Sequence, residues 1–166
     1  MKDNTKVYSS KQEHLVADVL GWEVVAGSGA AACFPGDIKS DEWLGECKTH
    51  TSPNHRILFK KDVWNKICSE STFARRNPVL VVDDGSQRKD RTWCLFLRNC
   101  LRTPEVTFVD ISKYCRVNIS FSHECMEKSS KGCKIAYPGK LVMFETSWNG
   151  QDVLVCKLED FAEAIQ

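Results

Sequence analysis

Two acidic residues and a lysine occur at a spacing that can build a metal-dependent site for phosphodiester cleavage. Glu46 follows Asp37 by nine residues, and Lys48 lies two residues beyond Glu46. Two carboxylates can hold a hard divalent cation such as Mg²⁺, and an ammonium group can serve an attacking water or the charge that develops on a phosphate. The competing interpretation is a surface hairpin with solvated charges. The apolar neighbours Ile38 and Cys47 argue against it, because an unpaired buried charge is costly.

A β-hairpin would bring the three side chains together. The sequence predicts strands at about 35–40 and 43–48, joined by a tight turn. With a two-residue loop, Asp37 lies directly opposite Glu46, at a Cβ separation of about 4.5–5.5 Å. Lys48 shares the face of Glu46 because side chains alternate along a strand. Asp-Glu is not a favoured two-residue loop, and a longer loop or a bulge would shift the register.

Two further motifs precede the hairpin. Ser10 and Glu13 have the spacing of a capping box, which predicts a helix over about 11–20 that ends at Gly21. A short strand expected at 22–26 is followed by Gly-Ser-Gly at 27–29. This glycine segment is either a plain turn or a loop in which the backbone approaches a phosphate closely.

In the order and spacing of these motifs the chain resembles the PD-(D/E)xK nuclease superfamily, and within it the archaeal-type and phage Holliday junction resolvases. The resemblance covers about residues 9–98, with one glycine inserted in the family's Pro-Asp motif. The family's helix glutamate, Gly-Ser-Gly segment, aspartate and Glu-x-Lys are matched here by Glu13, 27–29, Asp37, Glu46 and Lys48.

The resemblance implies a Mg²⁺-dependent endodeoxyribonuclease, in which Mn²⁺ can substitute, acting on branched DNA in recombination and repair. Asp37 and Glu46 would hold the metal, with the Cys47 carbonyl and Glu13 as further ligands. Lys48 would orient or activate the water. Glu13 thus has two open interpretations, a metal-site carboxylate or a capping-box residue. A resolvase cuts two symmetric strands, so a homodimer is expected.

Other functions stay open. The chain can be another nuclease of this superfamily, of restriction or repair type, or a non-catalytic DNA-binding protein on the same scaffold. The intact acid-acid-lysine set argues against a binding scaffold, since a decayed site would be expected to lose one of the three residues.

Candidate DNA contacts lie outside the acidic motif. Ser28 and Gly29 can contact a phosphate, and Lys60 and Lys61 stand at the start of a helix expected to about residue 73, where cations are unfavourable for the helix dipole. Solvated surface is the plainer interpretation of these lysines. The formal net charge is only +1, so DNA binding would require segregated charge. His50 and His55, in a polar loop, can assist proton transfer or are simply exposed.

The whole chain predicts an α/β fold: a restriction-endonuclease-like mixed sheet flanked by helices, with extra C-terminal strands and a short helix. One nuclease domain over 1–166 is expected, with a catalytic core at about 9–98 and an extension at about 99–166. A loop is expected at 129–132 and a hairpin turn at Asn149-Gly150. The remaining strands are expected at 79–82, 92–97, 106–109, 116–121, 141–144 and 153–156, and the final helix at 158–164.

The composition indicates where the protein is located in the cell and whether its cysteines are reduced. No run approaches the roughly 18 apolar residues of a membrane helix, and no apolar segment follows the N-terminus, so we expect a cytoplasmic protein of a phage or prokaryotic cell interior, without a membrane partner. The nine cysteines are then expected to be reduced. A zinc site is the sharper alternative for four residues whose types suit that metal: Cys115, His123, Cys125 and Cys133.

Overall fold

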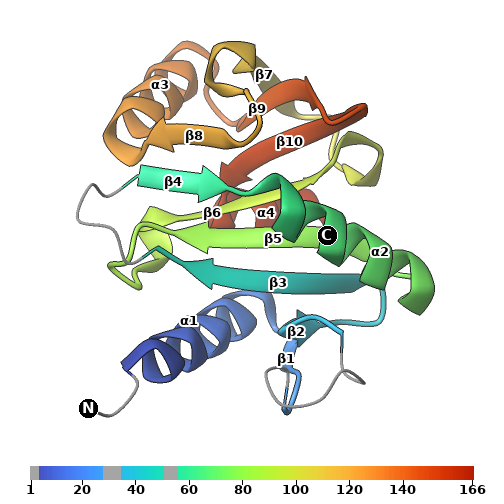
Figure 1. Ribbon diagram of the computed structural model, residues 1–166. Coiled ribbons are helices and arrows are strands. Elements are labelled where there is room, and N and C mark those ends of the chain that lie inside the picture. The colour runs from blue at the N-terminus through green and yellow to red at the C-terminus, as the bar shows by residue number, and fades with distance from the viewer. Residues whose placement is uncertain (1–3, 28–34, 51–55) are drawn as a thin grey trace.

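The computed structural model describes residues 4–27, 35–50 and 56–166. They form a mixed α/β fold (Figure 1), as the sequence predicts. The elements are α1 (Asn4–Leu20), β1 (Glu23–Val24), β2 (Ile38–Lys39), β3 (Trp43–Thr49), β4 (Arg56–Phe59), α2 (Lys61–Ala74), β5 (Asn77–Asp83), η1 (Lys89–Arg91), β6 (Thr92–Leu97), η2 (Arg98–Cys100), β7 (Val106–Asp110), η3 (Ser112–Tyr114), β8 (Ile119–Ser122), α3 (His123–Ala136), β9 (Leu141–Trp148), β10 (Gln151–Lys157) and α4 (Leu158–Ala164).

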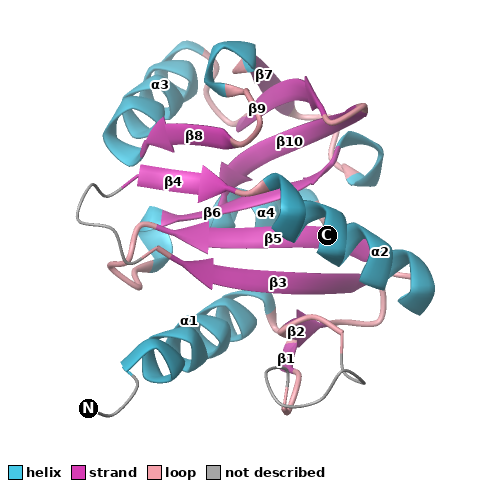
Figure 2. Ribbon diagram, viewed as in Figure 1, coloured by secondary structure: helices cyan, strands magenta, loops and turns pink. Residues whose placement is uncertain are grey.

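One large mixed sheet organises the molecule. Its eight strands run in the order β1-β2-β3-β5-β6-β10-β9-β7, and β4 pairs with β8 in a separate two-stranded sheet. The strands of both sheets are drawn as magenta arrows in Figure 2. β3 pairs in parallel with β5, and β7 in parallel with β9, while the other neighbours are antiparallel. The region after residue 100 therefore completes the same sheet that carries the acidic motif.

The continuous apolar run in β5 explains why helices cover both sheet faces. Alternate residues enter different cores: Leu80 packs with the α2 side chains Trp64 and Ile67, whereas Val81 packs on the face covered by α1 and α4. A strand buried on both faces is expected to be apolar throughout rather than alternating. α2, α3 and the β4-β8 pair thus lie on one face of the large sheet, and α1 and α4 on the other.

The predicted hairpin is present with the predicted register. Ile38 pairs with Gly45, Lys39 with Leu44, and the Ser40 amide donates to the Trp43 carbonyl at 3.0 Å across the two-residue turn. The pairing is shorter than expected, because β2 contains only two residues.

The first helix begins earlier than predicted. α1 starts at Asn4, so Ser10 lies inside the helix and cannot be its N-cap. The capping-box interpretation of Glu13 is therefore wrong. The end of the helix is confirmed: Gly21 follows Leu20 with a φ of +67°, the left-handed conformation typical of a helix C-terminus.

Two elements were missed. The loop expected at 129–132 lies within α3, and no strand was expected at the position of β4, Arg56–Phe59. α3 and β4 both belong to the layer over the α2 face of the large sheet. The predicted Asn149-Gly150 turn does join β9 to β10, with φ of +54° and +73°. No helix among the residues with described structure is long and apolar enough to span a membrane.

Candidate active site

Asp37 lies at the point where the short β2 strand begins and is held against β3. Its amide donates to the Gly45 carbonyl at 2.8 Å, and its Oδ2 accepts from the Cys47 amide, also at 2.8 Å. The residue therefore contacts the backbone on both sides of Glu46. Because Ile38 enters the core shared with α1, alternation places Asp37 on the opposite face, with Glu46. The sequence-predicted pair of acids is thus brought together.

Glu46 is a buried carboxylate with two cations beside it. The residue is only 3% exposed. Lys48 Nζ lies 2.6 Å from Glu46 Oε1, and Lys66 Nζ lies 3.3 Å from both carboxylate oxygens. Burial lowers the pKa of the Lys48 ammonium, but its hydrogen bond to Glu46 and the nearby charges outweigh burial, and the net pKa is raised. Lys48 therefore stays charged at the site.

α2 supplies two site residues that the sequence reasoning missed. Lys66 contacts Glu46 and also lies 3.7 Å from Glu70, four residues further along the helix. Glu70 Oε2 in turn accepts from the Gly36 amide at 3.1 Å, directly before Asp37. The sequence signal was the Lys-Glu pair at i,i+4, which shows that the two side chains share a helix face. It does not show that this face turns toward the acidic hairpin.

Glu13 joins the group from the other side of β3. The pKa of its carboxyl group is raised to about 7: burial is the largest cause, the Asp37 and Glu46 charges add to the rise, and Lys48 opposes it. The charges that act on Glu13 are thus those of the predicted site. The structure therefore supports the metal-site interpretation of Glu13 over the capping interpretation.

The neighbouring Gln12 anchors α1 to β3. Its Nε2 donates to the Lys48 carbonyl at 2.9 Å, and the side chain is 1% exposed. Its Oε1 is buried without a hydrogen-bond partner, which is costly unless a donor approaches. Gln12 fixes both the end of β3 and the position of Glu13 on α1.

The donor set suits a hard divalent cation, although the side chains are not arranged as a ready-made ligand cluster. Within 4–27, 35–50 and 56–166, no group of three or more His, Cys, Asp or Glu side chains has a metal-binding arrangement. Asp37, Glu46 and Glu13 nevertheless supply the carboxylate oxygens that Mg²⁺ prefers. Two lysines currently neutralise Glu46, so a cation would have to take over their role. The Cys47 thiol is buried in the opposite core, which leaves only its carbonyl as a ligand.

Some of the predicted DNA contacts lie outside the described residues, and others lie on the surface at the start of α2. Ser28, Gly29 and His55 lie outside the residues whose structure is described. Lys60 and Lys61 are exposed at the start of α2. Lys60 lines a hollow of about 440 Å³ together with Lys48, so one of the two predicted lysines shares a hollow with a residue of the candidate site.

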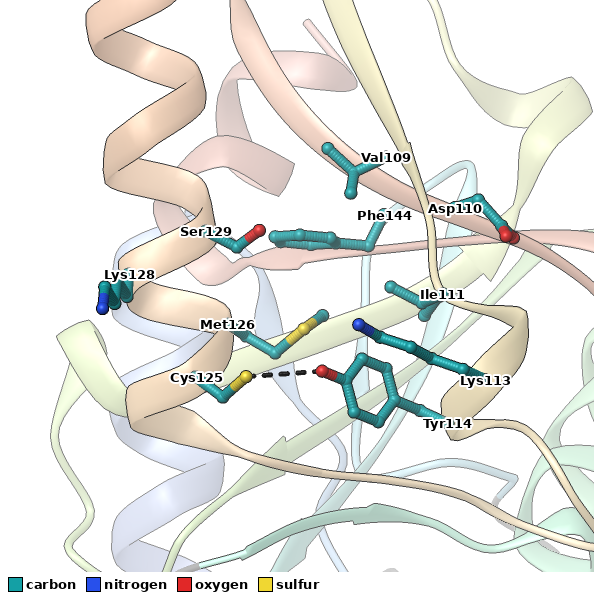
Figure 3. A pocket seen from close by; sticks show the side chains of 10 residues that line it. All are labelled: Val109, Asp110, Ile111, Lys113, Tyr114, Cys125, Met126, Lys128, Ser129 and Phe144. Carbon is teal, nitrogen blue, oxygen red and sulfur yellow. Dashed lines mark hydrogen bonds between the residues drawn. The ribbon is translucent and has the colours of Figure 1, made fainter.

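Three of the four residues considered for zinc have other polar contacts. Trp93 Nε1 donates to His123 Nδ1 at 3.0 Å, and the Cys115 thiol donates to the Ile111 carbonyl at 3.4 Å. Cys125 Sγ lies 3.3 Å from Tyr114 Oη beside a second hollow, of about 390 Å³, between α3 and η3 (Figure 3). The residues given coordinates show no zinc-like cluster among them.

No protein-family model, no curated protein and no solved structure matches the chain. The function is therefore inferred from the geometry of the site and from the resemblance of its motifs.

Proposed function

We propose that the protein is a metal-dependent DNA endonuclease that hydrolyses phosphodiester bonds and acts on branched DNA, with four-way junctions as its substrate. One observation carries this proposal. Asp37 is held against β3 beside Glu46, Lys48 contacts Glu46, and the charges of these three residues influence the Glu13 carboxyl group. The same residues in the same order form the motif by which the chain resembles the PD-(D/E)xK nucleases.

The resemblance gives each residue a role that its position allows. Asp37 and Glu46, with the Cys47 carbonyl and Glu13, would hold Mg²⁺ or Mn²⁺. The bound cation would polarise the phosphate and lower the pKa of a coordinated water. Lys48, charged and half-exposed, would orient that water and stabilise the charge that builds on the phosphate oxygens. Water then adds to phosphorus and the bond to the 3′ oxygen breaks, which leaves a 5′-phosphate and a 3′-hydroxyl.

A second candidate function is DNA binding without cleavage. It is favoured by the two lysines that already neutralise Glu46, since a closed ion network needs no metal. In this alternative the acids would only hold the hairpin and α2 together.

The test is cleavage of an end-labelled four-way junction and of a linear duplex of matched sequence, with Mg²⁺ or with EDTA. The proteins are wild type, Glu46→Gln, and Glu105→Gln as a control at an exposed acid remote from the site. We expect symmetric, Mg²⁺-dependent cuts in the junction by wild type and Glu105→Gln, and a loss of at least about 100-fold in Glu46→Gln.

Three other results would change the conclusion. Equal cutting of both substrates would retain the nuclease and remove the preference for junctions. Cutting by Glu46→Gln at the wild-type rate would exclude this site as the catalytic centre. Junction binding without any cutting would favour the non-catalytic alternative.

A further inference from the structure

The hollow beside Lys48 lies next to the candidate metal ligands. It is bounded by the end of β3, by β4 and β5, and by the first turn of α2, and its volume is about 440 Å³. Glu46 pairs with Leu80 and Lys48 with Val82 across the parallel β3-β5 ladder. Since residues two apart share a face, the floor of the hollow and the Glu46 carboxylate occupy neighbouring positions on the same face of the sheet.

The lining of the hollow combines an apolar floor with a cationic rim. Four aliphatic side chains contribute to it: Leu58 and Val63 are partly exposed, whereas Leu80 and Val82 are buried, at 0% and 2% exposure. Lys48 and Lys60 supply positive charge, and among the described lining residues Asp62 is the one acid. Within the described chain Lys60 forms no ion pair, so its charge is available to an anionic ligand.

This combination suits one part of a DNA chain. A phosphate group would bind to the lysines alone, because contact with aliphatic side chains adds nothing to its binding free energy. A base or a deoxyribose ring does gain by covering that floor, but in a duplex the bases are stacked and paired. An extruded base is held by apolar or aromatic side chains in the known mode of base recognition. The volume lies within the range of about 300–1,000 Å³ that is typical of small-ligand pockets.

We propose that this hollow binds one unpaired nucleotide adjacent to the scissile phosphate, with its base on the aliphatic floor and its phosphate between Lys48 and Lys60. The inference rests on the proposed nuclease function and specifies its substrate: DNA with a nucleotide that is unpaired in the complex. The preference for branched DNA then follows from the low cost of unpairing a base at a branch point, compared with the cost inside a duplex.

The test places 2-aminopurine, a base whose fluorescence rises when it leaves the stack, either at the branch point of a four-way junction or in the middle of one arm. Binding is measured in EDTA, so the signal requires no cleavage and is independent of the proposed activity. We expect a several-fold rise in fluorescence on saturation for the branch-point probe and little change for the arm probe. Equal signals from the two probes would overturn the proposal.

Two variants test the hollow itself. Val63→Trp fills it, and Lys60→Ala removes a rim charge without altering the core; Lys128→Ala, at an exposed lysine of α3, is the matched control. The ratio of the Kd for a linear duplex of matched sequence to the Kd for the four-way junction should fall at least fivefold in Val63→Trp and in Lys60→Ala but not in Lys128→Ala. If Val63→Trp does not fold, as judged by its thermal transition, Lys60→Ala decides alone. An unchanged ratio in a folded variant would refute the nucleotide site, whether or not the protein cleaves DNA.

Discussion

At the scale of single residues, Glu46 has two possible partners. In the structure its charge is balanced by Lys48 and Lys66, and under the proposed function it is balanced by Mg²⁺. Lys66 is more than half exposed, and such ion pairs contribute only about 0.2–1 kcal/mol. Under the proposed function, exchange of Lys66 for a metal cation would therefore cost little, and the ion network would stabilise the buried carboxylate while no metal is bound.

Replacement of Lys66 by methionine should strengthen metal binding. Lys66→Met removes a cation that competes for Glu46, so we expect Mg²⁺ affinity to rise about two- to fivefold, the equivalent of one exposed ion pair. Isothermal titration with Mg²⁺ measures this change, with Lys128→Met as the control. A weaker affinity would mean that Lys66 positions Glu46 and Glu70 rather than competing with the metal.

Glu13 should make stability and metal binding depend on pH in opposite directions. Its pKa is about 7 in the folded protein and near 4.5 when unperturbed. Between these values the folded state holds a proton that the unfolded state has lost, so stability falls as pH rises through this window. Mg²⁺ affinity should instead rise through about pH 7, as the carboxylate becomes ionised.

The variant Glu13→Gln tests both effects. In EDTA it should gain about 1–2 kcal/mol relative to wild type between about pH 5 and about pH 8, a value discounted for the half-buried position of the group. Urea unfolding at the two pH values gives this difference, and Mg²⁺ titration should show a weaker, pH-independent affinity. Parallel stability curves for the two proteins would contradict the raised pKa.

At the scale of elements, the turn after β5 holds the end of β3 in position. Gly85 has a φ of +90°, and a Cβ atom there would overlap the His50 carbonyl oxygen. Its amide donates to Asp83 Oδ1 at 2.9 Å, and Thr49 Oγ1 donates to the same oxygen at 2.6 Å. These contacts tie the end of β3 to the β5 turn and so help to position Lys48.

Two glycine substitutions should therefore have opposite effects. Gly85→Ala should destabilise the protein by about 2 kcal/mol or more, because both the dihedral and the backbone contact are strained, and it should lower cleavage by shifting the end of β3. Gly132→Ala lies in the interior of α3 with no atom within 4 Å of the added Cβ, and should stabilise by about 0.5–1 kcal/mol. Urea denaturation measures both. Destabilisation of equal size in the two variants would contradict this account.

The sequence predicts elements well where the signal is local. The Asn149-Gly150 turn, the apolar β5 strand and the end of α1 at Gly21 all follow from residues within each segment. α3 was missed because Ser129-Ser130 and Gly132 are typical of a loop, and the helix is stabilised by packing of Met126 in the core. A usable signal was present: Ser122 caps α3 by accepting from the Cys125 amide at 3.4 Å.

In the candidate site, too, the local arrangement could be predicted from the sequence and the long-range arrangement could not. Asp37, Glu46 and Lys48 could be grouped from the sequence because one hairpin with a fixed register holds them. Lys66 and Glu70 could not, because their approach depends on how α2 crosses the sheet. This crossing is set by the long-range packing of Trp64 and Ile67.

At the scale of the whole molecule, charge is nearly balanced, so DNA affinity must come from a local group of cations. The formal net charge is +1, and the site region supplies four lysines: Lys48, Lys60, Lys61 and Lys66. The region after residue 99 adds exposed apolar side chains such as Val117 and Ile135, 72% and 81% exposed.

Salt dependence tests this distribution. Four phosphate contacts predict a slope of log K against log salt of about −3 to −4 per protomer. Lys60→Ala should reduce the magnitude of the slope by about 0.9 and Lys128→Ala should leave it unchanged. Fluorescence anisotropy with a junction over a range of salt concentrations provides the values. A much steeper slope would place the main DNA contacts on other surfaces.

The short β2 strand has a consequence for how copies of the chain avoid one another. Beyond Gly45, β3 has no strand partner on its β2 side in the described structure, and an uncovered strand edge is a template on which another chain can pair. The Asp37 carboxylate occupies the Cys47 amide and places a negative charge at this edge. We therefore expect Asp37 to hinder the pairing of another chain with this edge. Asp37→Ala would remove this hindrance and the proposed ligand together, whereas Asp37→Asn keeps an acceptor for the amide and separates loss of metal binding from loss of solubility.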